Sequence, residues 1–408
     1  MNSASRKNLP HLVTNFGNLE PAPVLNGLFR FLNKAQANIV PGARKYHQIQ
    51  PVTSVNATAF TGSNYFIDFN LPMNVDMIDE EVLEVTLKNN NILTAWTADA
   101  SVPFWFQRIE IRHDGEIKQT LRDLHLYLDN TMFQNQEDRE RLHPLTGINP
   151  ETYKADTAVV SVGAGSTSTF RLKLNSFITK CNIFLKGISG QVVVRCYPQN
   201  ISAFSTSAVN SSIELQSATL LLREVNLSPE AEAKLSLVHR SNVDYRFIDV
   251  VHEETTISLT AGSTTRYVTN NFHDNLYSHV VVLTRANNAT GADLERFVAH
   301  SNVYLEDVAG QNLSNGIQWT DSLLRHVVYL SNFPNTMSLQ ADMNIYVPKV
   351  PSLSPEKAYK TGVNNGSDIL PRNTKVCINP SSTATRKVDV LCYAYMHCRI
   401  EGGKINIY

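Results

Sequence analysis

The stretch FQRIEIRHDGEIKQTLRDLHLYLDN, residues 106–130, sets out a short run of structure that the chain repeats later. It predicts a strand, a tight turn at His113-Asp114-Gly115, a short second strand and an amphipathic helix. About 200 residues further on, residues 302–330 show the same order: the strand NVYLEDV, a turn at Ala309-Gly310-Gln311, a short strand and an amphipathic segment. Self-similarity at a fixed spacing indicates a duplicated unit.

Three residue types recur at equal offsets in the two copies, namely Ile117, Thr120 and Leu124 in the first and Ile317, Thr320 and Leu324 in the second. Sequence identity between the two copies is limited to such positions. The repeated order of elements is therefore the better evidence for a duplication. At 408 residues the chain exceeds the size of one ordinary core, which agrees with two similar domains.

Composition points to a β-rich protein with a polar surface. Apolar residues make up 42% of the chain, enough for real cores, while charged residues make up only 18%. The formal net charge of -1 gives no overall attraction to nucleic acid or to acidic membranes. No run of 18 apolar residues predicts a membrane span, and no apolar region follows the first seven residues, so a signal peptide is not expected.

The five cysteines are odd in number and form no Cys-x-x-Cys pair. Cys392 and Cys398 are separated by an even number of residues in one predicted strand, so they share a face of it. We therefore expect all five to be buried, reduced thiols.

Residues 1–45 differ from the rest of the chain. Six basic residues against one acid give this arm a charge of +5, so residues 46–408 carry -6. Within the arm, four apolar residues have i, i+3, i+4 and i+7 spacing and predict one apolar face of a short helix: Leu25, Leu28, Phe29 and Leu32. The basic residues Arg30 and Lys34 lie in the same segment. The helix could pack on its own domain or contact an acidic or apolar partner, and the pattern leaves both open.

After the arm, period-2 alternation predicts strands throughout. One strand is expected over residues 213–225, and the clearest, over 387–400, alternates for more than a dozen residues. Between them, Ser228 and Pro229 followed by acidic residues predict the start of a helix. Four stretches show no periodicity and are predicted to be long loops: 134–166, 198–212, 285–300 and 350–373.

The expected fold is all-β, with two tandem eight-stranded jelly-roll β-sandwiches, short helices and a basic N-terminal arm. The domains are predicted as an arm over 1–45, a first jelly roll over 46–227, a linker helix over 228–240 and a second jelly roll over 241–408.

Catalytic and cofactor motifs are not found in the sequence. It contains no His-Glu-x-x-His, Gly-x-Ser-x-Gly, Walker A or Gly-x-Gly-x-x-Gly pattern. Gly163-Ala164-Gly165 lacks the lysine of a phosphate loop and precedes a predicted strand. His113 and His125 have an acid within two residues, but the histidines form no His-x-His pair for a metal. We predict no catalytic, cofactor-binding or metal-binding residues, and no enzyme.

The segments VPFWFQRIEI, residues 102–111, and GEIKQT, residues 115–120, resemble double jelly-roll major capsid proteins of virophages and of polinton-like and related DNA viruses. The resemblance implies a pseudo-hexagonal homotrimer that tiles an icosahedral shell, and a place in the virion after assembly in the host cytoplasm or nucleus. The partners implied are further copies of the chain and minor capsid or penton proteins. The genome or an internal membrane could be reached through the arm.

Two other classes of function remain open. One is a binding module such as a viral spike, a penton or a lectin-like tandem β-sandwich, although a penton would need only one jelly roll. The other is a β-sandwich glycan hydrolase, which would require two carboxylates in a cleft.

Overall fold

The structure is a computed structural model, and it describes residues 45–53, 55, 60, 65–131, 136–239, 243–270, 277–313, 344–349 and 373–408. The six arm residues singled out above lie outside these ranges, as does most of the second copy of the repeated unit, including Ile317, Thr320 and Leu324.

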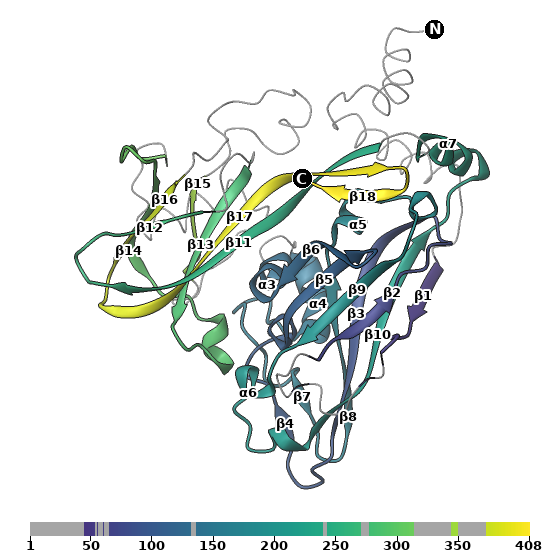
Figure 1. The fold of residues 1–408 in the computed structure, drawn as a ribbon. Coiled ribbons are helices and arrows are strands. Elements are labelled where there is room, and N and C mark those ends of the chain that lie inside the picture. The colour runs from purple at the N-terminus through teal and green to yellow at the C-terminus, as the bar shows by residue number, and fades with distance from the viewer. Residues whose placement is uncertain are drawn as a thin grey trace.

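The first half of the chain forms a sandwich of two four-stranded antiparallel sheets (Figure 1). One sheet has the order β1 (Lys45–Ile49), β10 (Ile213–Val225), β3 (Met77–Asn89) and β8 (Thr167–Leu174). The other has the order β2 (Ile67–Asn70), β9 (Val192–Pro198), β5 (Phe106–His113) and β6 (Glu116–Arg122). A two-stranded pair, β4 (Trp96–Thr97) and β7 (Ser161–Val162), lies beside them.

When β4 and β7 are left out and the remaining eight strands are renumbered from 1 to 8 along the chain, the two sheets have the orders 1-8-3-6 and 2-7-4-5. This winding is that of a jelly roll, in which strands distant in sequence become neighbours. Strand β10 matches the prediction for residues 213–225, and it pairs with the arm-proximal β1 on one side and β3 on the other.

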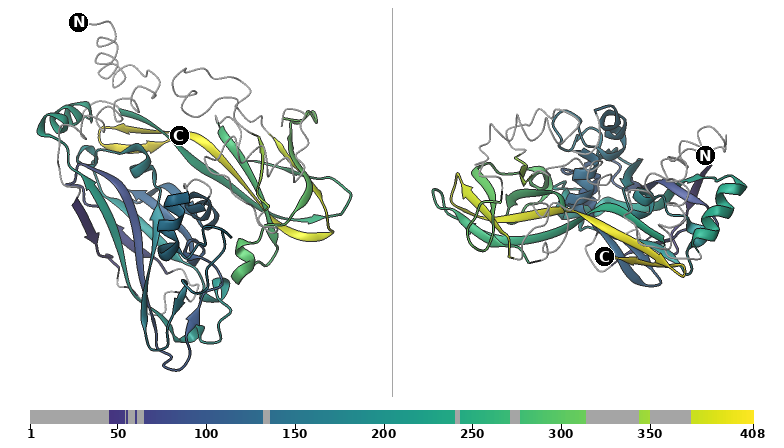
Figure 2. Two further views of the ribbon diagram at one scale, coloured as in Figure 1. Left: turned by 180° about the vertical axis from the view of Figure 1, so that it is seen from behind. Right: turned by 90° about the horizontal axis from the view of Figure 1, so that it is seen from above.

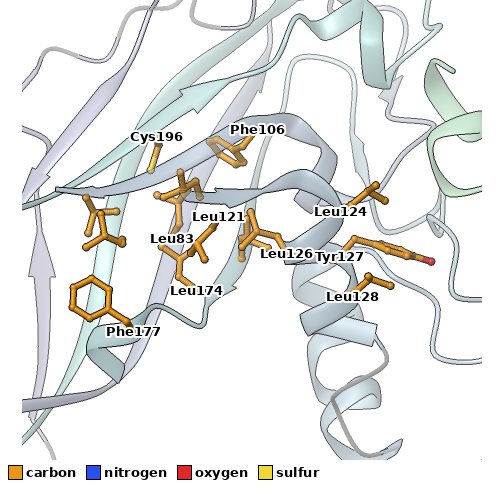
Figure 3. Packing of buried hydrophobic residues seen from close by; sticks show 14 of the residues in the cluster. Leu83, Phe106, Leu121, Leu124, Leu126, Tyr127, Leu128, Leu174, Phe177 and Cys196 are labelled. Atoms are coloured by element: carbon orange, nitrogen blue, oxygen red, sulfur yellow. The ribbon is translucent and has the colours of Figure 1, made fainter. Parts of the chain in front are cut away.

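Alternation along the strands fills the space between the two sheets. Leu83, Val85 and Leu87 of β3 are buried, while the residues between them lie half-buried on the outer face. Figure 3 shows part of this core, where Leu83 and Leu174 from one sheet meet Leu121 and Cys196 from the other. The predicted strands with one face in a core are confirmed here.

Large aromatic side chains close one end of the first core. The rings of Trp96 and Trp105 meet edge to face with 5.9 Å between centroids, and Trp105 stacks on Phe204 at 5.5 Å. Both tryptophans are fully buried. Trp96 belongs to β4, and the indole N–H of Trp105 donates to the Ala100 carbonyl at 2.9 Å.

Helices differ from expectation in two places. α3 (Asp123–Thr131) is buried on all sides from Leu124 onward. The helix was predicted to be amphipathic, and this is wrong because the observed helix has no face exposed to solvent. The reason is that α3 packs against β5 and β6 of its own sandwich, while the rings of Tyr393 and Phe297 from the second half lie against His125 and Tyr127. α4 (Gln136–Thr146) and β7 lie in the stretch 134–166 that was predicted to be a long loop.

The second half repeats the same winding. One sheet has the order β11 (Val243–Leu259), β17 (Ala384–Glu401), β13 (Tyr277–Ala286) and β15 (Tyr346–Lys349), and β18 (Lys404–Ile407) also pairs with β17. The other has the order β12 (Thr265–Val268), β16 (Lys375–Pro380) and β14 (His300–Glu306). Strands β11, β17, β13 and β15 thus follow the order of β1, β10, β3 and β8 in the first half, and β12, β16 and β14 follow the order of β2, β9 and β5.

In the chain order between the two sandwiches, α7 (Pro229–His239) confirms the helix predicted after Ser228. The Ser228 hydroxyl accepts the Ala231 N–H at 3.2 Å, and Glu230 and Glu232 occupy the first turn. A hydroxyl cap with acidic residues beside it satisfies the free N–H groups and the positive end of the helix dipole.

Strands β11 and β17 form a long two-stranded ribbon. They pair over all 17 residues of β11, and β17 continues through a turn into β18. Figures 1 and 2 show this ribbon running from the second sandwich across the top of the first. The long strand predicted over 387–400 is confirmed. It is long enough to pair within the second sandwich and also to extend over the first.

All five cysteines lie buried, and none takes part in a disulfide. Burial raises the pKa of the Cys392 thiol to about 12, which keeps it protonated and unreactive.

A carboxyl group lies in the first core. Glu81 of β3 points inward and is fully buried. Burial raises its pKa from 4.5 to about 7, against a smaller lowering effect of Ser176. The folded chain therefore holds this proton more tightly than the unfolded chain does. The resulting stabilisation is fully present below about pH 4.5 and is lost as the pH rises to about 7.

We expect Glu81→Gln to stabilise the protein at pH 8 by about 2–3 kcal/mol, because a neutral amide removes the cost of ionising a buried carboxyl. The change should also flatten the dependence of unfolding free energy on pH between 4.5 and 7. Urea denaturation at several pH values measures both effects. Glu214→Gln, on the half-buried side of β10, is the control and should change little. An unchanged or lower stability of Glu81→Gln at pH 8 contradicts the expectation.

Candidate functional site between the two jelly rolls

The most extensive polar site lies where the second sandwich contacts the first. The ribbon of β11 and β17 lies against α5 (Phe177–Cys181), whose Phe177 ring lies 5.8 Å from that of Phe247. Lys180 of α5 donates to the Ile248 carbonyl at 3.1 Å. An aromatic contact and a charge-assisted hydrogen bond therefore fix one end of the interface.

The turn after β17 docks on the first sandwich through its backbone. Ser189 N–H donates to the Gly403 carbonyl at 2.9 Å. Gly403 has φ of +80°, and a Cβ there would lie 2.7 Å from the Ser189 nitrogen, so only glycine fits. Ile405 N–H donates to His113 Nδ1 at 3.4 Å, which leaves Nε2 to donate to the Ser189 carbonyl at 2.6 Å. His113 is thus a buried connector of the two sandwiches.

Gln119 joins three elements with one side chain. Its amide nitrogen donates to Asp249 Oδ1 of β11 at 2.7 Å, and its oxygen accepts the Phe177 N–H at 2.8 Å. Both Gln119 and Asp249 are buried. Because both the nitrogen and the oxygen of this buried amide are hydrogen-bonded, Gln119 fixes the positions of β11 and α5 relative to β6.

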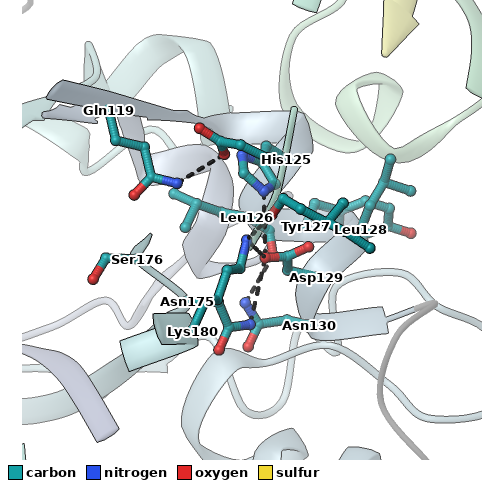
Figure 4. A network of polar contacts seen from close by, with 12 residues as sticks. Gln119, His125, Leu126, Tyr127, Leu128, Asp129, Asn130, Asn175, Ser176 and Lys180 are labelled. Carbon is teal, nitrogen blue, oxygen red and sulfur yellow. Dashed lines mark hydrogen bonds and ion pairs between the residues drawn. The ribbon is translucent and has the colours of Figure 1, made fainter. Parts of the chain in front are cut away.

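A second polar cluster lies around α3 (Figure 4). Asp129 Oδ2 is 3.4 Å from His125 Nε2 and 3.9 Å from Lys180 Nζ, and it accepts a hydrogen bond from Asn175 at 3.4 Å. Burial alone would raise the pKa of Asp129, but His125 and Lys180 outweigh it and the pKa is lowered. The His125 ring also meets the Tyr393 ring of β17 edge to face at 6.3 Å.

Glu295 of the second sandwich accepts three hydrogen bonds from the first. It ends the short helix η5 (Gly291–Glu295), and its carboxylate accepts hydrogen bonds from the backbone N–H and the hydroxyl of Ser101. Its other oxygen accepts the Ala155 N–H at 2.5 Å. Burial raises the pKa of Glu295 to about 7 despite these three donors.

A charged group in the second sandwich has the composition of a possible metal site. His252, Glu254 and Asp389 bring ligand atoms within 4.8 Å of one another. Both carboxylates already have cations: Arg285 lies 2.9 Å from Asp389, and Lys387 lies 2.7 Å from Glu254. With neutral histidine the group and its two cations carry no net negative charge, so its electrostatics do not favour a divalent ion.

Together these contacts hold the two sandwiches as one block. None of the arm residues predicted to make contacts (Leu25, Leu28, Phe29, Arg30, Leu32 and Lys34) lies in the described part of the chain, so that prediction is untested. Gln119, Asp249 and Glu295 were not predicted from the sequence as site residues. A polar residue inside an alternating strand was the available signal for the first two, whereas Glu295 lies in a stretch without periodicity.

We expect Glu295→Ala to weaken the contact between the sandwiches, because two buried donors of Ser101 and the half-buried N–H of Ala155 would lose their acceptor. The cost should be about 2–4 kcal/mol. Hydrogen exchange with mass spectrometry should show faster exchange at Ser101 and Ala155. Asp293→Ala, on the same short helix but exposed and paired with Arg296, is the matched control and should cost less than about 1 kcal/mol. Equal effects of the two changes rule out the connecting role of Glu295.

No protein-family model and no curated protein sequence matches the chain. Solved structures do match. PBCV-1 VP54, fitted into a reconstruction of the virophage Sputnik, has a TM-score of 0.65 at 11% identity over 89% of this chain and 96% of that one. The Faustovirus major capsid protein has a TM-score of 0.62 at 10% identity, covering 92% and 97%. A chain of Sulfolobus turreted icosahedral virus has a TM-score of 0.52 at 10% identity, covering 86% and 90%. Two sandwiches of the same winding, with this likeness, show that the chain has the double jelly-roll fold of viral major capsid proteins.

Proposed function

We propose that this protein is a viral major capsid protein that forms the shell of the virion. The observation that carries the proposal is the pairing of two jelly rolls of equal winding, held as one block by a buried interface. The likeness to the Faustovirus major capsid protein over nearly the whole of both chains supports it.

The finer proposal is a homotrimer with a pseudo-hexagonal outline. Each chain presents two similar bodies side by side, so three chains related by a threefold axis present six similar corners. Closed cyclic symmetry is the common form of homo-oligomers, and hexagonal outlines tile a surface without gaps. Trimers of this shape would cover the faces of an icosahedral shell, with penton proteins at its corners.

A catalytic role finds no support in the buried carboxyl groups. Glu81 and Glu295 each have a pKa near 7, which is in the range of a general acid. Both are almost completely buried, and they lie in different parts of the molecule. A glycan hydrolase needs two carboxylates that face each other across an open cleft. These two serve packing and domain contact.

The N-terminal arm is proposed to face the interior of the shell. Its charge of +5 contrasts with -6 for residues 46–408, and such asymmetry is typical of two faces with different partners. The partners proposed are neighbouring capsomers, minor capsid proteins, and the genome or an internal membrane. Assembly would take place in the host cytoplasm or nucleus.

We expect purified protein at micromolar concentration to have the mass of three 45.6 kDa chains in size-exclusion chromatography with light scattering. The reason is that an obligate interface of roughly 2,000 Å² or more keeps such oligomers together. Negative-stain electron microscopy should show hexagonal particles or shells. A stable monomer that binds glycans would instead favour a lectin-like module and contradict the proposal.

Deletion of residues 2–40 should leave both jelly rolls and the trimer intact but reduce shell assembly. The deletion removes four of the six cations of the arm, and each phosphate neutralised by a cation steepens the salt dependence of binding by roughly one log unit. Shell yield, measured by sedimentation at several salt concentrations, tests this expectation. Closed shells formed by the deleted protein at the yield of the full chain show that the arm has no assembly role.

A further inference from the structure

A small pocket lies on the outer face of the first sandwich. Half-buried apolar side chains from two strands and from α4 form its inner surface: Val82, Leu221, Leu142 and Leu145. Charged residues from three strands surround it: Glu80, Arg171, Lys173 and Arg223. Tyr46 of β1 stands at its side with 62% of its surface exposed.

The charges around the pocket are largely compensated. Arg223 pairs with Asp79 at 2.6 Å and with Glu80 at 3.0 Å, and Arg171 pairs with Glu84 at 2.7 Å. The pocket therefore offers little electrostatic attraction to a charged ligand. What it offers is apolar surface, which favours an apolar occupant.

The size of the pocket selects the kind of occupant. Its volume is about 130 Å³. An engineered apolar protein cavity of about 150 Å³ holds one benzene molecule. The pocket therefore suits a single aromatic ring or branched aliphatic side chain, presented by a chain that lies over the sheet.

The sequence provides such a side chain close by. β1 begins at Lys45, where the N-terminal arm joins the sandwich, and Tyr46 already lines the pocket. The predicted arm helix carries Phe29 on its apolar face. The 14 residues from Leu32 to Tyr46 span at most about 45 Å, whereas three strand spacings cover about 14 Å. Pro41-Gly42 supplies a turn by which the chain can fold back.

We propose that the arm of the same chain docks on this face and inserts Phe29 into the pocket. Leu25, Leu28 and Leu32 then cover the surrounding sheet and the exposed Tyr46. The short tether gives the arm a millimolar effective concentration, which favours its own pocket over that of another copy. The proposal does not depend on capsid assembly.

Docking in this way leaves the basic side of the helix free. Arg30 and Lys34 lie on the side opposite Leu25, Leu28 and Leu32 at 3.6 residues per turn. They would point away from the sheet toward an acidic or phosphate-bearing partner. Docking and the proposed contacts of the arm are therefore compatible.

A disulfide trap in the full-length protein tests the docking directly. Phe29→Cys combined with Leu142→Cys should form an intrachain disulfide under mild oxidation, because a disulfide needs Cα atoms within about 7 Å. The native thiols are buried and compete little. Phe29→Cys combined with Ile117→Cys, on the half-exposed β6 of the opposite sheet, is the control and should stay reduced. Equal yields in the two variants, or disulfides between chains only, overturn the proposal.

Limited proteolysis provides a second test without a new covalent bond. Trypsin should cut after Arg30 and Lys34 about tenfold faster in Leu145→Asp than in the unchanged chain, because cleavage follows the population of the undocked arm. Ile117→Asp, a control of the same chemistry away from the pocket, should leave the rate unchanged. Circular dichroism confirms that each variant is folded, and Leu221→Asp replaces Leu145→Asp if that variant is not. Equal cleavage rates in folded variants also overturn the docking.

Discussion

The antiparallel pairing of β11 with β17 is the constraint on which the rest of the molecule depends. One end of this ribbon covers α5 and the edge of the first sandwich, and the other end forms the core of the second. Its backbone hydrogen bonds run without interruption from one domain into the other. A change in the relative orientation of the two jelly rolls therefore has to bend this ladder or release the ribbon from its contacts with α5 and Ser189.

Polar contacts then select one orientation among those that the ribbon would permit. Gln119, Glu295 and the Asp129 cluster each place a buried polar group of one sandwich against a specific partner in the other or beside it. Removing one partner is costly, because it leaves a buried group unsatisfied, although each pair contributes little net stability. We infer that these contacts matter more for defining the shape of the block than for its total stability.

The sequence predicted the long strands well, because alternation is strong where one face of a strand is buried. β10 and β17 are the clearest examples. It did not predict β2, β12 or β18, which are only four residues long and too short for a period to be recognised. α4 was missed because it contains Pro144 and many charged residues. Glu295 could not be foreseen, because its partners lie 194 and 140 residues away in sequence.

The C-terminal position of β17 and β18 has a consequence for synthesis. All eight strands of the first jelly roll are complete by Val225, so this domain can fold while the remainder is still being translated. The second domain has to wait, since β11 finds its main neighbour only when residues up to 401 have left the ribosome. Until then β11 exposes an unpaired edge of 17 residues, a template for aggregation. The pairing of β17 with β11, which forms late in synthesis, thus protects the newly made chain from aggregation at high concentration.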